Sequence, residues 1–192
     1  MRLFIFPALL PVLGVLGSLD KADLSDPARA VVALPVPLLT GFWEEGLVRG
    51  FLLFVLLAAA LRSGRGPIAA VLGSSVVFGL MHAVNVINGD PAQVASQVIY
   101  ATFIGVCFAA LLLRTNALWM LVALHFLFDV DSALVPDGGG GDGGGGGFGV
   151  AGVLLTLPLA LYGLWLLRNR GADDGAVNAA RDPTPAPAPA RS

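Results

Sequence analysis

The sequence predicts an all-α protein, a polytopic transmembrane bundle of about six membrane helices. Hydrophobic residues make up 56% of the 192 residues and charged residues only 12%, which is about half the charged share of an ordinary soluble domain. The mean hydropathy is +0.82, and the apolar residues are gathered in runs of roughly 20, the length at which a helix crosses a bilayer. We therefore expect an integral membrane protein, in a bacterial cell membrane, with lipid as its surroundings.

Six segments have the length and composition of a membrane helix. The first follows Arg2, is short and contains Pro7 and Pro11, so a signal peptide is the competing interpretation. No A-x-A cleavage site follows this segment, and we interpret it as a retained helix. The last segment contains Pro158, which membrane helices tolerate and which predicts a kink. The six predicted segments are residues 3–18, 34–61, 67–88, 92–113, 115–135 and 148–167.

The basic residues between these segments predict the orientation of the chain. Most of them fall on one side of a six-helix serpentine, and the positive-inside rule then places both termini in the cytoplasm. The residues on that side are Arg2, Arg62, Arg65, Arg114, Arg168 and Arg170, and those opposite are Lys21 and Arg29. We expect residues 1–170 to form one transmembrane domain, 138–147 a flexible glycine-rich outer loop, and 171–192 a disordered Pro- and Ala-rich cytoplasmic tail.

The composition also argues against several classes of function. The formal net charge is −2 and the basic residues are scattered, so no nucleic-acid partner is expected. Cys107 is the single cysteine, which rules out an intrachain disulfide and a cysteine-rich metal site. No glycine-rich phosphate-binding motif and no internal repeat of an inverted-repeat transporter is found. The oligomeric state is left open.

The stretch GFWEEGLVRGF places three charged residues inside an apolar run. Glu45 and Arg49 are spaced i, i+4, so they share a helix face and can pair, whereas Glu44 points away from both. A charged side chain in the bilayer costs about 2.5–3.5 kcal/mol on insertion scales. Because Arg49 is paired with Glu45, the second glutamate has no structural explanation, and we expect Glu44 to be functional.

Two further predicted helices carry polar residues at the same spacing. FGLMH places Phe78 and His82 on one face, and HFLFD places His125 and Asp129 on one face. Counted from the outer ends of their helices, these ionisable residues and Glu44 lie about 6–10 residues deep, or roughly 9–15 Å. The ionisable residues of three helices are therefore expected to converge in the same half of the membrane.

A carboxylate and two histidines at one depth suit the hydrolysis of a peptide bond. Water must lose a proton, and the oxyanion that develops must be stabilised. Glu44 with His82 could hold the water, and His125 with a polar neighbour could serve the oxyanion. Alternatively, His82, His125 and Glu44 could bind zinc with an open fourth position, although the HExxH spacing is absent. We favour a site that requires no cofactor, with zinc as the alternative.

The order EEGLVRG, FGLMH, HFLFD resembles the three motifs of the CPBP family: EExxxR, FxxxH, and Hxxx followed by Asn or Asp. This family comprises intramembrane endopeptidases that include the type II CAAX prenyl proteases and the bacterial Abi proteins. All three motifs occur in order on separate predicted helices, with a motif core at about 41–132. The resemblance implies an endopeptidase that cleaves a lipidated, CAAX-like or membrane-embedded peptide.

The resemblance also implies a role for each motif residue. Glu44 would act with His82 on the catalytic water, and the third motif would line the site. The catalytic residues would be Glu44, His82, His125 and Asp129. The supporting residues would be Glu45, Arg49 and Phe78.

Two features depart from the family pattern. Position 129 is Asp where the prenyl protease branch usually has Asn, so an amide donor to the oxyanion is missing unless Asp129 is protonated, and the Abi branch is the closer likeness. The chain is also short, without helices that longer members place before the first motif, which leaves the substrate open. The alternative interpretation is a non-catalytic Abi-type membrane protein with an immunity, partner-binding or proton-coupled carrier role.

Overall fold

The computed structural model describes residues 1–19, 31, 34–134 and 149–181, and all regular elements in these ranges are helical. Two short 3-10 elements are η1 (Arg2–Phe4) and η3 (His82–Ile87), and η2 (Gly46–Leu52) is π-helical. The α-helices are α1 (Ile5–Ser18), α3 (Pro35–Glu45), α4 (Leu53–Arg62), α5 (Pro67–Met81), α6 (Pro91–Thr115), α7 (Leu118–Leu134) and α8 (Gly149–Arg181).

These elements reproduce the predicted helical segments. α3, η2 and α4 follow one another without a break and together form the second predicted segment, and α5 with η3 forms the third. Three helices of the described chain are long and apolar enough to cross a membrane: Pro67–Ile87, Pro91–Thr115 and Gly149–Arg168. Arg2–Ser18 and Leu118–Val130 are shorter apolar helices. The fold is thus the all-α membrane bundle that the composition predicted.

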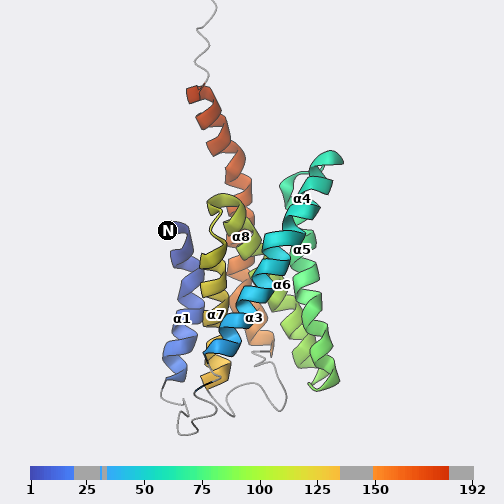
Figure 1. Ribbon diagram of the computed structural model, residues 1–192, viewed down its shortest axis with the longest axis vertical. Coiled ribbons are helices and arrows are strands. Elements are labelled where there is room, and N and C mark those ends of the chain that lie inside the picture. The colour runs from blue at the N-terminus through green and yellow to red at the C-terminus, as the bar shows by residue number, and fades with distance from the viewer. Residues whose placement is uncertain (20–30, 32–33, 135–148, 182–192) are drawn as a thin grey trace, which may run out of the picture.

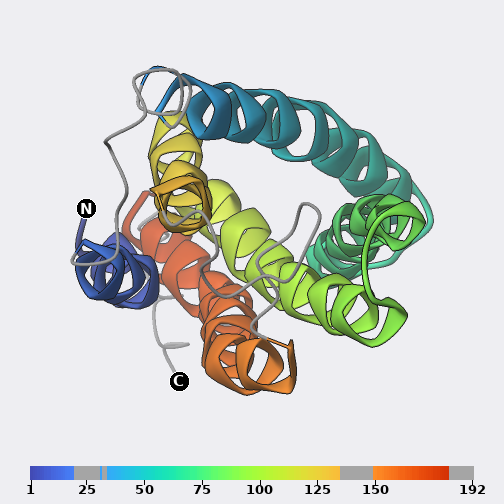
Figure 2. The same ribbon diagram turned by 90° about the horizontal axis from the view of Figure 1, so that it is seen from below.

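Helix α6 lies in the middle of the bundle, with α8 along one side and α5 against another (Figure 2). Residues 104–112 of α6 are all buried, as expected of a helix that is covered on every side. Glycines permit these close approaches. A Cβ at Gly163 of α8 would lie 2.8 Å from the Val106 carbonyl oxygen, and a Cβ at Gly79 of α5 would collide with the Thr102 side chain. Small residues commonly occupy such contacts between membrane helices.

The connections that carry arginines lie at one end of the bundle. The start of α1, the α4–α5 connection and the α6–α7 connection are all at the end from which α8 projects (Figure 1). Between α6 and α7 the turn is tight, because Asn116 adopts a left-handed conformation with φ of 52°, which asparagine tolerates better than most residues. The chain therefore follows the predicted serpentine path.

Helix α8 is longer than predicted. It contains Pro158 and continues without interruption through Gly171 to Arg181, whereas the sequence predicted a disordered tail from Gly171. Residues 171–181 include four alanines, and alanine has the highest helix propensity. The predicted glycine loop at 138–147 and the remainder of the tail from 182 lie outside the described residues.

Candidate active site

The first motif spans the junction between α3 and the π-helical segment η2. Glu44 and Glu45 are the last two residues of α3, and Arg49 lies within η2. Short π-helical segments within α-helices are frequent at functional sites. The side chains of Glu45 and Arg49 are both 0% exposed, and Arg49 Nη1 donates to Glu45 Oε1 at 3.1 Å. The pairing predicted from the i, i+4 spacing is confirmed.

Arg49 also lies between two aromatic rings. Its Cζ atom is 4.0 Å from the centroid of the Phe78 ring and 5.7 Å from that of Phe108, so the ring faces provide cation–π attraction inside the bundle. Its Nε and Nη2 atoms have no hydrogen-bond partner among the described residues. The hydrogen bond to Glu45 and the two aromatic contacts therefore help to hold this buried cation, and the contact with the Phe78 ring shows how Phe78 supports the first motif.

His125 of α7 lies at the centre of the polar cluster. Its Nδ1 is 2.8 Å from Glu45 Oε1, and since an ionised carboxylate only accepts, Nδ1–H is the donor. Its Nε2 faces two more carboxylates, at 3.6 Å from Glu44 Oε2 and 3.4 Å from Asp129 Oδ2. Glu45 thus bonds to Arg49 and His125 at once. The second of these bonds joins α3 to α7, so the spacing within one helix gave no sign of it.

Gly41 brings α3 close to α7 at this point. A Cβ at Gly41 would lie 3.2 Å from the Cβ of His125 and 3.3 Å from the Val122 carbonyl oxygen, which is tighter than ordinary packing. Any larger residue would move His125 away from the glutamates. The sequence analysis missed Gly41, and its position one helical turn before Glu45 is the signal that could have indicated it.

His82 lies where α5 changes to the 3-10 segment η3. Its backbone N–H bonds to the Gly79 carbonyl, so the Phe78 carbonyl, which would accept that N–H in an α-helix, instead bonds to His82 Nδ1 at 3.0 Å. A carbonyl oxygen can only accept, so Nδ1 carries the proton and Nε2 of the neutral ring carries the lone pair. The His82 and Phe78 rings meet edge to face, with their centroids 5.1 Å apart. The FxxxH spacing thus fixes both the tautomer and the direction of this imidazole.

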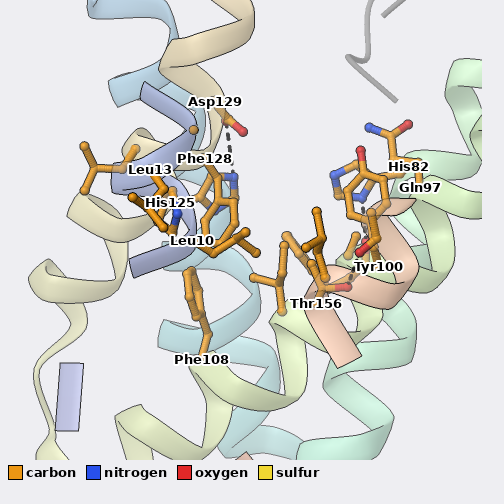
Figure 3. A pocket seen from close by; sticks show the side chains of 18 residues that line it. Leu10, Leu13, His82, Gln97, Tyr100, Phe108, His125, Phe128, Asp129 and Thr156 are labelled. Atoms are coloured by element: carbon orange, nitrogen blue, oxygen red, sulfur yellow. Dashed lines mark hydrogen bonds and ion pairs between the residues drawn. The ribbon is translucent and has the colours of Figure 1, made fainter. Parts of the chain in front are cut away.

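A pocket of about 390 Å³ lies between α1, α5, α6, α7 and α8, and its lining is mostly apolar. Polar side chains line it on two sides (Figure 3). His125 and Asp129 form one wall, and His82, Gln97 and Tyr100 lie opposite. The sequence analysis did not single out Gln97, although an amide inside the apolar run of α6 is a recognisable signal. The amide of Asn85, in η3, donates to Gln97 Oε1 at 2.9 Å.

Glu44 stands beside the wall formed by His125 and Asp129 and is not part of the pocket lining. Its side chain is 20% exposed, and its buried Oε2 atom has no hydrogen-bond partner among the described residues. The structure therefore brings the predicted residues of the first and third motifs into contact. It places His82 across the pocket from them.

The three residues considered for zinc do not form a donor set in this arrangement. Among the described residues, no group of three or more His, Cys, Asp and Glu side chains is placed to hold a metal ion. His82 lies on the opposite side of the pocket from His125 (Figure 3).

Comparison with known proteins agrees with the motif pattern. Residues 26–130 match the family model for the type II CAAX prenyl endopeptidase Rce1-like proteins, more than half of the 192 residues. The matched range contains all three motifs and leaves α1 and α8 outside. No curated protein and no solved structure matches the chain. The chain therefore belongs to the type II CAAX prenyl endopeptidase Rce1-like family of intramembrane proteases.

Proposed function

We propose that the protein hydrolyses a peptide bond in a lipidated, CAAX-like or membrane-embedded peptide, using a water molecule activated by Glu44 and His82. The observation that carries this proposal is the Glu44 carboxylate, whose buried Oε2 lies 3.6 Å from His125 Nε2 at the wall of the pocket and has no hydrogen-bond partner among the described residues. Glu45 Oε2 lacks such a partner as well, but its carboxylate already bonds through Oε1 to Arg49 and His125. An acidic side chain inside an apolar bundle is costly unless it has a structural partner or a chemical task.

The two groups have complementary roles toward the water. Glu44 accepts the proton that the water loses as it attacks the peptide carbonyl, which is the task of a general base. His82 Nε2 carries a lone pair, because Nδ1–H is held by the Phe78 carbonyl, and so it accepts the second hydrogen of the water and orients it. His125, within 3.6 Å of Glu44 Oε2, keeps the carboxylate in place.

No metal is required in this mechanism. The support for this part of the proposal is the arrangement of the donors, since Glu44, His82 and His125 do not form a metal-binding group. The carboxylate and the imidazole lone pair supply two hydrogen-bond acceptors on opposite sides of the pocket, and the attacking water would lie between them.

The lining of the pocket supports an apolar substrate. Leu10 and Leu13 of α1, Phe108 of α6, Phe128 of α7 and Leu155 of α8 all contribute to it. At about 390 Å³ the pocket has the size of a small-molecule site. A hydrophobic peptide segment or a lipid-modified residue would bury apolar surface there, whereas a strongly charged peptide would lose its hydration without compensation.

Glu44→Gln tests the proposed base, because the amide has nearly the same volume and cannot take a proton from water. Purified protein in lipid vesicles would be assayed on a farnesylated CAAX peptide and on unmodified membrane peptides. We expect the wild type to cleave at least one of them and Glu44→Gln to lose at least about 10²-fold in rate. Asp90→Asn is the control, because Asp90 caps α6 away from the pocket and asparagine caps equally well.

Full activity of Glu44→Gln would refute the assignment of the base. A correctly folded wild type that cleaves none of the peptides would count against the protease and for the non-catalytic alternative.

We also infer that both termini face the cytoplasm. The support is the position of the arginine-bearing connections, which share one end of the bundle with the start of α1 (Figure 1). Arginine and lysine are enriched in the cytoplasmic loops of membrane proteins.

A further inference from the structure

Peptide hydrolysis needs a hydrogen-bond donor for the carbonyl oxygen, and the carboxylate wall of the pocket does not provide one. The Nδ1–H of His125 donates to Glu45, and its Nε2 lies 3.6 Å from Glu44 Oε2 and 3.4 Å from Asp129 Oδ2, so a hydrogen on Nε2 is directed at these carboxylates. Asp129 Oδ2 is directed at His125 Nε2 at 3.4 Å, and an ionised carboxylate accepts hydrogen bonds and cannot donate them. A carbonyl oxygen at this wall would compete with three carboxylates for the hydrogens of His125.

His82, on the opposite wall, does not fill this role either. Its Nδ1–H is used by the Phe78 carbonyl, and the neutral ring then presents a lone pair at Nε2. A lone pair suits the orientation of a water molecule and is wrong for an oxyanion.

Gln97 is placed to donate. Its side chain lines the pocket beside His82 (Figure 3), and its Oε1 accepts from Asn85 Nδ2 at 2.9 Å. A primary amide has one acceptor oxygen and two N–H donors on its nitrogen. With Oε1 held by Asn85, the donors of Gln97 Nε2 are left for the pocket. Because Asn85 lies three residues after His82 in η3, one short segment positions both the imidazole and the amide.

We propose that Gln97 Nε2 donates to the carbonyl oxygen of the scissile peptide and stabilises the oxyanion. This inference rests on the proposed function and identifies a further catalytic residue, with Asn85 as its positioning residue. Gln97 thereby supplies, from α6, the amide donor that an aspartate at position 129 does not offer.

The proposed step is balanced in atoms and charge. The water oxygen bonds to the carbonyl carbon while Glu44 takes one water proton, and the C=O π electrons move to the oxygen that Gln97 holds. When the tetrahedral intermediate collapses, the C=O bond reforms and the C–N bond breaks. The proton on Glu44 then passes to the leaving nitrogen.

Gln97→Glu tests the donor, because it keeps an oxygen for Asn85 and replaces the NH2 group by a second oxygen of similar size. Using vesicles and a farnesylated CAAX peptide, we expect kcat to fall by about 10²–10³-fold, the usual effect of removing one oxyanion donor, with KM within about threefold. Gln93→Glu is the matched control, since Gln93 is exposed, lies one turn earlier on α6 and is outside the pocket. It should retain the wild-type kcat.

Asn85→Ala leaves Gln97 in place but removes its anchor. We expect a smaller loss in kcat, of about fivefold, the scale set by one hydrogen bond of roughly 1 kcal/mol. Wild-type kcat in Gln97→Glu, with cleavage by the wild type demonstrated in the same vesicles, would overturn the assignment and leave the proposed function intact.

A binding measurement separates this inference from the proposed function. Affinities are measured for a farnesylated peptide ketone and for the same peptide with a methylene group in place of the ketone carbonyl. Gln97→Glu should weaken the ketone by about tenfold or more and the methylene compound by less than about threefold, because only the ketone accepts the amide hydrogen bond. An equal loss for both would mean a purely structural role and would refute the assignment, whether or not turnover is detected.

Discussion

The variant Glu45→Gln tests whether Glu45 has a structural role that differs from the proposed catalytic role of its neighbour Glu44. Glu45 Oε1 accepts from Arg49 at 3.1 Å and from His125 at 2.8 Å, and neither Glu45 nor Arg49 is exposed. Glutamine keeps an acceptor oxygen in nearly the same place but carries no charge. The buried guanidinium then loses the carboxylate to which it is hydrogen-bonded, and its Nε and Nη2 have no hydrogen-bond partner in the part of the chain that the structure describes.

Breaking a buried ion pair in this way costs about 3–5 kcal/mol. For a chain of this length, each kcal/mol lowers the midpoint of thermal unfolding by about 2–4 °C, so Glu45→Gln should unfold about 6–20 °C below the wild type in the same detergent. Glu44→Gln should change the midpoint little, because Glu44 is 20% exposed and its nearest ionic contact is 3.6 Å long. Differential scanning fluorimetry on both purified variants measures the difference.

The charge exchange Glu45→Arg with Arg49→Glu provides a second measurement. It restores an ion pair within α3 and η2 but places a cation against His125 Nδ1. We expect part of the thermal stability to return and activity to stay absent. A Glu45→Gln midpoint within about 2 °C of the wild type would refute the reasoning, because it would mean that the pair is hydrated and contributes little.

Phe78→Leu should lower the unfolding midpoint by a few degrees, because it removes the ring that lies 4.0 Å from the Arg49 guanidinium and with it about 0.5–2 kcal/mol of cation–π attraction; an unchanged midpoint would contradict this account. A reporter fused after Arg170 should be cytoplasmic and one inserted at 138–147 external, and the reverse pattern would invert the assigned orientation. Elemental analysis of active, detergent-purified protein should find substoichiometric metal, and chelators should inhibit weakly. One tightly bound zinc per chain that is lost in His82→Ala would overturn the metal-free mechanism.

The sequence predicted correctly those side-chain contacts that form within a single helix. The Glu45–Arg49 hydrogen bond and the Phe78–His82 contact both follow from i, i+4 spacing. The six segments followed from apolar runs of the right length, because the bilayer requires such runs. These parts of the fold depend on the local sequence.

Contacts between helices could not be predicted in the same way. The Glu45–His125 bond joins residues 80 positions apart, and the placement of Gln97 opposite Asp129 depends on how α6 packs against α5 and α7. Helical periodicity gives the faces of each helix but not which faces meet. The sequence indicated that His125 with a polar neighbour could serve the oxyanion, but it gave no sign that both ring nitrogens of His125 face carboxylates.

The π-helical segment Gly46–Leu52 has a consequence for how this chain can be altered. A π segment behaves as an α-helix with an added residue, and each residue turns an α-helix by about 100°. Deleting one residue within 46–52 would therefore produce a more regular helix and rotate α3 relative to α4 by about 100°. The two glutamates of α3 could then no longer face α7 while α4 keeps its present packing. A redesign that idealises the helices of this chain should therefore leave residues 46–52 unchanged.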